Sequence, residues 1–275
     1  MAGNEWRDAA PEAGTPPVRI DTSVAHMARV QDYWLGGRDN FAADRHAGDE
    51  AVAAFPGLVA SVRSTRAFLA RTVRYLTAGE GIRQFLDIGT GIPTAGNTHS
   101  VAQAIAPDAL VLYMDNDPVV FAHARGLLSS GPHGSTAYVN TDLRDTGKVL
   151  TDATRMLDLS QPVALVLMSV LQFIPDAEDP WKIVATLLDA LAPGSFLVVS
   201  HPANDIEARV MATMAARLNE LMAEQVRLRS QEEVDGFFNG LRLVPPGIVQ
   251  IPAWRPDSAE VASRVGTMWG GVGQK

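Results

Sequence analysis

The 275-residue chain contains no cysteine. It therefore cannot form disulfides or thiolate-ligated zinc and iron–sulfur sites, and it has no cysteine nucleophile. Long apolar runs are also lacking, because the longest, residues 163–170, is far below the roughly 18 residues that a membrane span needs. Residues 1–10 have no apolar stretch of the kind found in a signal peptide. These absences predict a cytoplasmic protein without a membrane partner.

The chain also has no excess of basic over acidic residues. The chain has 23 lysines and arginines against 31 acidic residues, which gives a formal net charge of −8. Proteins that bind the phosphate backbone usually carry a strongly basic surface, so we expect no nucleic-acid partner. The histidines are too scattered in the sequence to make a metal pattern, and we expect no metal. They are His26, His46, His99, His123, His133 and His201.

The sequence pattern divides the chain into three parts. Residues 1–19 contain several prolines and glycines with few apolar residues, which is typical of a mobile tail. Residues 20–79 carry apolar side chains at helical spacing and predict an N-terminal helical cap. Its helices are expected at 24–35, 41–55 and 58–78. Residues 80–275 alternate short apolar runs with amphipathic segments, which predicts an α/β core with a helical insertion at 205–240.

The alternation in the core predicts a doubly wound, mostly parallel sheet covered by helices on both faces. Strands are expected at 84–88, 110–114, 137–140, 163–168 and 196–200, with helices at 98–105, 118–129, 145–157 and 179–191. A helix over 205–226, a second that opens at the capping box Ser230–Glu233, and strand-like runs at 241–251 and 265–272 complete the chain. The fold class is therefore α/β, with seven strands that end in an antiparallel hairpin.

The first functional signal is the turn after strand 84–88. Gly89 and Gly91, spaced by one residue, let the backbone turn sharply and approach a ligand closely. A dinucleotide-binding turn has a third glycine or an alanine three residues later. Thr94 stands there instead, preceded by Pro93. The turn is thus typical of a nucleotide site other than a dinucleotide site, and a tight turn without a ligand is the alternative.

Acidic residues follow the next two strands. Asp115 follows strand 110–114, where a carboxylate accepts hydrogen bonds from both hydroxyls of a ribose. Asp142 follows strand 137–140, where it can accept from the exocyclic amine of adenine while Leu143 offers an apolar wall to the ring. Each acid alone is more often a cap or turn residue. Polar turns at three consecutive strand ends nevertheless favour a nucleotide site at the carboxyl edge of the sheet.

Together these motifs resemble the actinobacterial S-adenosyl methyltransferase family, formerly a domain of unknown function. That family lies within the Rossmann-like, seven-stranded superfamily of class I methyltransferases. The resemblance extends from about residue 19 to the C-terminus. The stretches that carry it are 32–44, 85–94, 96–99, 113–120, 254–256 and 269–273.

The resemblance implies an S-adenosylmethionine-dependent methyltransferase. The acidic composition and the helical cap favour a small-molecule acceptor, for example a secondary metabolite. The residues that would contact the cofactor are Tyr33, Arg66, Asp87, Gly89, Thr90, Gly91, Asn97, Asp115, Asn116, Asp142, Leu143 and Ser169. Arg66, with Arg63 one turn before it, would reach the carboxylate of the cofactor, although both could instead lie on a solvated helix face. Tyr33 would face the cavity from a lid formed by 32–44, for which a purely structural cap is the alternative.

The methyl acceptor and the catalytic groups are left open by the sequence. His201 follows strand 196–200, where such folds begin their acceptor pocket, and is the best candidate for a base. Gln172 stands where the family often has a histidine after the fourth strand, which keeps a second hypothesis open: a non-catalytic protein that senses S-adenosylmethionine or S-adenosylhomocysteine. A nicotinamide-dependent oxidoreductase is the third hypothesis, disfavoured by Thr94. The sequence does not determine the oligomeric state.

Overall fold

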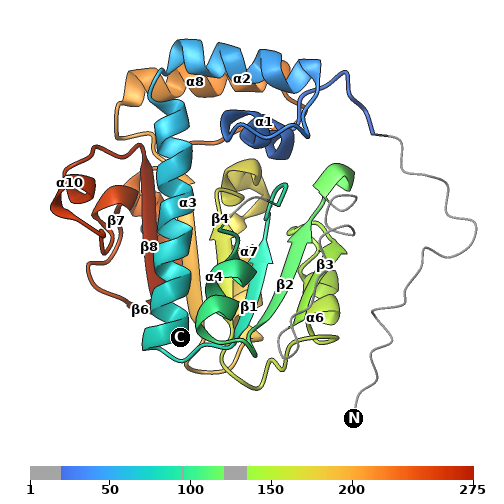
Figure 1. Cartoon of the computed structure of the whole chain (residues 1–275), viewed down its shortest axis with the longest axis vertical. Coiled ribbons are helices and arrows are strands. Elements are labelled where there is room, and N and C mark those ends of the chain that lie inside the picture. Colours follow the sequence, from blue (N-terminus) through green and yellow to red (C-terminus); the bar gives the residue numbers. More distant parts are fainter. Residues whose placement is uncertain (1–19, 94–95, 121–134) are drawn as a thin grey trace, which may run out of the picture.

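A single mixed sheet forms the centre of the molecule (Figure 1). The computed structural model describes residues 20–93, 96–120 and 135–275. The strand order is β3-β2-β1-β4-β5-β8-β6, with β7 also paired to β8. The first five strands pair in parallel and confirm the five predicted strands. They are β1 (Gln84–Ile88), β2 (Leu110–Asp115), β3 (Ser135–Asn140), β4 (Ala164–Met168) and β5 (Phe196–Pro202).

The antiparallel end of the sheet is built around β8 (Met268–Gln274), which pairs with β5, β6 (Arg242–Leu243) and β7 (Val249–Gln250). The run expected as one strand at 241–251 is divided, and this detail of the prediction is wrong. Pro245 and Pro246 lie between the two short strands and lack the N–H donors that a continuous strand would use. Since β6 and β7 both pair with β8, they occupy one position in a seven-position sheet.

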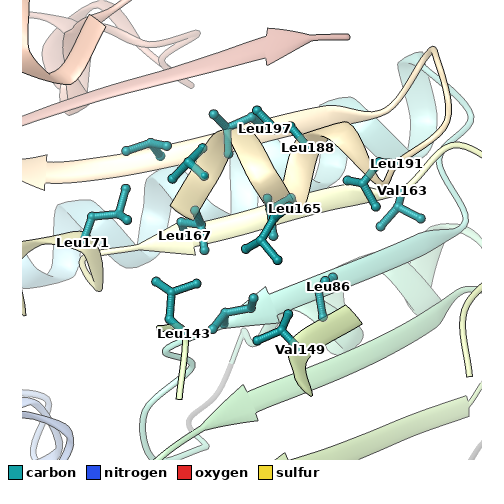
Figure 2. Close-up of a cluster of buried hydrophobic side chains, with 14 of the residues drawn as sticks. Leu86, Leu143, Val149, Val163, Leu165, Leu167, Leu171, Leu188, Leu191 and Leu197 are labelled. Atoms are coloured by element: carbon teal, nitrogen blue, oxygen red, sulfur yellow. The ribbon is translucent and has the colours of Figure 1, made fainter. Parts of the chain in front are cut away.

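The parallel part of the sheet lies between two apolar cores, one on each face. All five residues of β1 are buried, and they alternate between the faces. Leu86 and Ile88 belong to one core cluster, whereas Phe85 belongs to the other. Figure 2 shows part of the first cluster, in which Leu165 and Leu197 from neighbouring strands lie close to Leu188. Apolar residues on both faces explain why the sequence pattern there is nearly continuous rather than alternating.

Helices cover both faces, as the pattern predicts. On one face lie α3 (Leu58–Arg74) and α4 (Thr98–Ile105), and on the other lie α6 (Thr146–Ala153) and α7 (Pro180–Asp189) (Figure 1). The short helix α9 (Gln231–Asp235) belongs to the second face, because its Val234 packs in the same cluster as Val149 of α6 and Val184 of α7. Phe68, Leu69 and Val73 of α3 pack into the same cluster as Phe85, so this helix belongs to the layer that covers the sheet. Short turns complete the described chain: η1 (Tyr75–Gly79), η2 (Leu171–Phe173), η3 (Asp176–Glu178), η4 (Gly236–Phe238), η5 (Ile251–Ala253) and α10 (Ala259–Ala262).

A third layer stands above the carboxyl edge of the parallel strands. It consists of α1 (Met27–Trp34), α2 (Ala42–Ala54) and α8 (Ala208–Leu221) (Figure 1). Their buried side chains, among them Val30, Ala47 and Met211, form a separate apolar cluster. Helices far apart in sequence thus cover the edge at which parallel sheets bind ligands. The division into tail, cap and core stays a prediction.

The remaining helix predictions differ from the structure mainly in length. The helix at 98–105 is confirmed, whereas those expected at 145–157, 179–191 and 205–226 are shorter. Thr94 and most of the helix expected at 118–129 lie outside the described residues. Within the described ranges, none of the helices has both the length and the apolar character required to cross a membrane.

Candidate functional site

Two connected hollows lie between the carboxyl edge of the sheet and the helices above it. The first, here called the acidic hollow, is lined by Asp115 and Asp142, and the second, the apolar hollow, includes Met168 and Met211. Including the space at their mouths they measure about 600 and about 880 Å³, which is the range of small-molecule sites. Four residues line both hollows: Met27, Gln31, Gly89 and Ser169. The hollows are therefore two parts of one site.

The turn after β1 forms the floor at the junction. Gly89 and Gly91 have φ angles of +74° and +66°, in the left-handed region that favours glycine. A Cβ atom added to Gly89 would lie 2.4 Å from Cγ2 of Val170. The Gly89 N–H donates to the Met114 carbonyl oxygen at 2.8 Å, which fastens the turn to β2. Glycine is thus required there by both conformation and space.

Asp115 lies directly beside this turn at the end of β2. Its Oδ2 accepts from the Gly91 N–H at 2.8 Å and its Oδ1 from the Asp117 N–H at 2.9 Å. Burial raises the pKa of Asp115, and these two hydrogen bonds oppose the rise. The carboxylate is held in one orientation at the wall of the acidic hollow, where remaining lone pairs can accept from a ligand.

The third strand end adds the far wall of the acidic hollow. Asn116 Nδ2 donates to Asp142 Oδ2 at 3.1 Å, and the Arg144 N–H donates to Asp142 Oδ1 at 2.8 Å. Leu143 is buried and lines the same hollow. The structure therefore brings together the polar strand ends that the sequence analysis selected, since parallel strands end at one edge.

Charged side chains lie at the β1 side of the apolar hollow, which Asp87, Arg66 and Thr90 line. Asp87 accepts from Thr98 Oγ1 at 2.5 Å, and Arg66 Nη2 donates to Asn97 Oδ1 at 2.5 Å. Burial raises the pKa of Asp87 to about 6, against the opposing effects of Thr98 and Arg66. A half-buried cation, Arg66, and a buried acid, Asp87, are thus available for a ligand that carries both charges.

Two more residues selected from the sequence lie in different places: Arg63 is away from both hollows, and Ser169 is at their junction. Arg63 is exposed and lines neither hollow, as expected for a solvated helix face. Ser169 lies at the junction, with a φ of 53° and its Oγ 3.2 Å from Ser200 Oγ. A non-glycine residue in this conformation is uncommon and is found mostly at functional turns.

Tyr33 does not face the cavity. Its hydroxyl donates to Asp49 Oδ1 at 2.7 Å, and it lines neither hollow. Met27 and Gln31, four residues apart on α1, are the side chains that line both hollows. Residues at this spacing share a helix face, whereas Tyr33 projects toward α2. Helix α1 thus covers the site as expected, but Met27 and Gln31 rather than Tyr33 face the hollows.

His201 lies on the wrong face of the sheet for a general base in either hollow. Its ring is fully buried and packs against Phe237, and its Nε2 is 2.8 Å from Arg229 Nη1. Burial and the Arg229 charge lower the pKa of His201 to about 3. Side chains alternate along β5, so Pro202 lines the apolar hollow and His201 points away.

The sequence analysis missed an ion-pair cluster at the mouth of the acidic hollow. His26 Nδ1 lies 2.8 Å from Asp117 Oδ2, and His26 Nε2 lies 3.3 Å from Glu224 Oε1. This His26 cluster joins the start of α1, the turn after β2 and the segment after α8. Its members are more than 90 residues apart in sequence, roughly a third of the chain, and no local pattern signals such contacts. In the described part of the chain, no group of side chains suits a metal ion.

Comparison with known proteins identifies the relatives of the chain. A family model described as S-adenosyl methyltransferase matches residues 13–275. A DUF574 family protein from Streptomyces avermitilis is 42% identical, with a TM-score of 0.89, 94% of this chain and 100% of that chain covered. A candidate methyltransferase from Thermobifida fusca is 38% identical, with a TM-score of 0.87 and coverage of 96% and 99%. No curated protein matches the chain.

More distant structures share the fold alone. The plantazolicin methyltransferase BpumL, solved with S-adenosylhomocysteine, is 12% identical, with a TM-score of 0.52 and coverage of 90% of this chain and 95% of that chain. Together with the strand order, this likeness confirms the fold class that the sequence predicts. The full-length family match confirms the resemblance on which the sequence analysis rested.

Proposed function

Because the chain belongs to the S-adenosyl methyltransferase family and is an S-adenosylmethionine-dependent methyltransferase, we propose that it methylates a small molecule held in the apolar hollow. The observation that supports this proposal is the junction of the two hollows at Gly89 and Ser169. A nucleoside and a separate apolar molecule can meet there, away from bulk water.

The residues of the site suit S-adenosylmethionine in charge and shape. Gly89 lines both hollows, and its turn packs directly against Val170, so the backbone of this turn would face the cofactor at the junction. Asp115 would accept from the ribose hydroxyls, and Asp142 and Leu143 would hold the adenine. Asp87 and Arg66 would bind the ammonium and carboxylate of its amino-acid end. When bound, the cofactor supplies a methyl group that its sulfonium already activates.

A small acceptor suits the enclosure of the apolar hollow. Helices α1, α3 and α8 all contribute to its wall, for example through Met27, Leu58 and Met214. A net charge of −8 disfavours a polyanionic acceptor. The cytoplasmic location remains a prediction, and the oligomeric state stays open.

The second candidate function is a cofactor-binding regulator without methyl transfer. The observation that favours it is the position of His201, which removes the predicted base from the site. A base is not needed in every methyl transfer, so the position of His201 alone does not decide between the two functions. The oxidoreductase hypothesis does not agree with the family to which the chain belongs.

Titration calorimetry tests the cofactor assignment. The full chain should bind S-adenosylmethionine and S-adenosylhomocysteine but not NAD. Asp115→Asn should weaken both by about 10- to 100-fold, because it removes charged hydrogen bonds worth about 1.5–3 kcal/mol. Asp108→Asn, in the exposed turn that precedes the same strand, is the matched control and should bind normally.

Two results would contradict the proposal: binding of NAD alone, or unchanged affinity in Asp115→Asn. Thermal unfolding of both variants verifies that they are folded. Methyl transfer from labelled S-adenosylmethionine to small molecules of a host extract separates the enzyme from the regulator. A regulator would bind the cofactor and transfer no label.

A further inference from the structure

Within the described part of the chain, one residue that lines the apolar hollow carries a buried polar atom without a hydrogen-bond partner. Gln172, in the short turn η2 after β4, lines this hollow and is only 5% exposed. Its side-chain oxygen Oε1 is buried and accepts no hydrogen bond within the described part of the chain. Buried polar atoms in native proteins are nearly always paired. An acceptor left open beside a cavity therefore suggests that the occupant of the cavity supplies the donor.

The backbone around this side chain is fixed. The Arg227 N–H donates to the Gln172 carbonyl oxygen at 2.8 Å, which ties η2 to the segment after α8. Neighbouring hydroxyls of the hollow are already engaged, because Ser61 Oγ and Thr267 Oγ1 lie 2.9 Å apart and Thr65 Oγ1 donates to the Ser61 carbonyl oxygen at 3.2 Å. Among the described residues that line this hollow, Gln172 is the one with a fully buried side-chain oxygen that accepts no hydrogen bond.

The other residues of the wall indicate which kind of molecule the apolar hollow would bind. Five of the nine methionines of the chain line the apolar hollow: Met27, Met168, Met211, Met214 and Met268. Methionine adapts to irregular apolar surfaces and packs well against aromatic rings. Among the described lining residues only Arg66 and Asp87 are charged, and the proposed function assigns both to the cofactor. The remaining surface suits an uncharged, apolar acceptor.

We propose that Gln172 positions the acceptor by accepting a hydrogen bond from a neutral N–H group on an otherwise apolar molecule, and that this nitrogen is methylated. This proposal rests on the proposed function. The hydrogen bond would fix the direction of the nitrogen lone pair relative to the methyl group. Gln172 is then a positioning and specificity-determining residue, since a carboxamide neither takes up nor releases a proton.

The groups in the hollow favour nitrogen over a hydroxyl. The nitrogen lone pair forms the new C–N bond as the bond from carbon to sulfur breaks, and the electron pair of that bond stays on sulfur. The methylated nitrogen is then cationic and releases its N–H proton to water. A hydroxyl must lose its proton by the time of attack. Among the described lining residues, Asp87 is the only group that can take up a proton, and it is engaged by Thr98.

Binding of three matched probes tests the role of Gln172. Indoline carries a neutral N–H, indane is the same bicycle with CH₂ in its place, and 5-indanol adds a hydroxyl to indane. Each is titrated into the full chain saturated with S-adenosylhomocysteine. Indoline should bind about fivefold to tenfold tighter than indane, as expected for one hydrogen bond to an unpaired acceptor.

Two variants separate Gln172 from the rest of the wall. In Gln172→Leu, the preference for indoline over indane should disappear, and indane should bind at least as tightly as it does to the unchanged chain. Gln31→Leu removes another carboxamide from the same hollow and should keep the preference. Gln172→Leu should also unfold at a higher temperature without ligand, because it removes a buried, unpaired oxygen.

The outcomes are distinct from those of the cofactor experiment. If S-adenosylhomocysteine does not bind, the proposed function fails. If it binds normally but no probe does, or indane equals indoline, or the preference survives in Gln172→Leu, the inference about Gln172 is overturned and the cofactor assignment stands. Tighter, Gln172-dependent binding of 5-indanol than of indoline would overturn the choice of nitrogen.

Discussion

The His26 cluster should hold helix α1 over the cofactor site, and its removal is a sharp test of that arrangement. The substitution is His26→Gln, which keeps a polar side chain but removes the positive charge between Asp117 and Glu224. The side chain of Asp117 is 2% exposed, and that of Glu224 is 28% exposed. The contact with Asp117 is therefore a buried ion pair, and the contact with Glu224 contributes less because solvent screens it.

The expected cost follows from what remains around Asp117. Loss of one partner from a buried pair costs about 3–5 kcal/mol when the other charge is left alone. Asp117 keeps the Val119 N–H at 2.8 Å and Arg29 Nε at 3.7 Å. We therefore expect the free energy of unfolding to fall by about 2–3 kcal/mol. For a protein of this size that corresponds to a lower melting temperature by about 4–10 °C.

The pH dependence of this loss of stability shows whether the positive charge of His26 causes it. Burial alone would lower the pKa of His26, but hydrogen bonds and charge from Asp117 and Glu224 outweigh it and raise the pKa to about 10. Between the ordinary value of 6.5 and about 10 the folded protein binds more protons than the unfolded chain, so this stabilisation falls as pH rises. The difference between the unchanged chain and His26→Gln should be largest near pH 6 and shrink towards pH 10.

Urea unfolding at several pH values measures the difference in the free energy of unfolding between the two proteins. Hydrogen exchange of the α1 amides measures how often this helix opens. His46→Gln, at an exposed position of α2, is the control and should change neither. If His26→Gln leaves both stability and α1 exchange unaltered, or if its effect grows with pH, the cluster does not act as described.

Two further predictions concern the end of β1 and the turn after it. Gly89→Ala should lower the free energy of unfolding by about 2–4 kcal/mol and weaken S-adenosylhomocysteine binding in calorimetry, because φ is +74° and the added Cβ would clash with Val170. Gly81→Ala, with a φ of +72° and open space around it, should lose only about 1–2 kcal/mol, and equal losses would refute the clash. Since burial raises the pKa of Asp87 to about 6 against Thr98 and Arg66, stability should fall by up to about 3 kcal/mol as pH rises from about 3.8 to about 6. Asp87→Asn should lack this fall in urea unfolding, and parallel pH profiles of the two proteins would refute it.

Local pattern in the sequence was sufficient for the parallel strands and for selecting the residues at their ends that we propose hold the cofactor. Strand β1 and its glycine turn are contiguous in the chain, and Asp115 and Asp142 each follow directly on a buried run. Parallel strands end at one edge, so finding the strands already places these residues together. Nothing about distant contacts was needed to select them.

The two site predictions that failed, Tyr33 and His201, required knowledge of which way a side chain points. Tyr33 and Gln31 lie two residues apart on one helix, and only the packing of α1 against α2 decides which faces the site. His201 follows Ser200 on β5, where a shift of one residue changes the face of the sheet. Position along the chain determined the neighbourhood of these residues correctly but not their orientation.

This difference explains why membership of the family specifies the cofactor and leaves the acceptor open. The acidic hollow takes its polar groups from three consecutive strand ends, so short motifs define it. The apolar hollow takes its wall from α1, α3, α8 and the start of β8, which are separated by up to about 240 residues. No short motif describes a surface assembled in this way, and its apolar side chains such as Leu58 and Met214 are not among those proposed to hold the cofactor. If Gln172 positions the acceptor as proposed, selectivity comes from its Oε1, which has no hydrogen-bond partner in the described part of the chain.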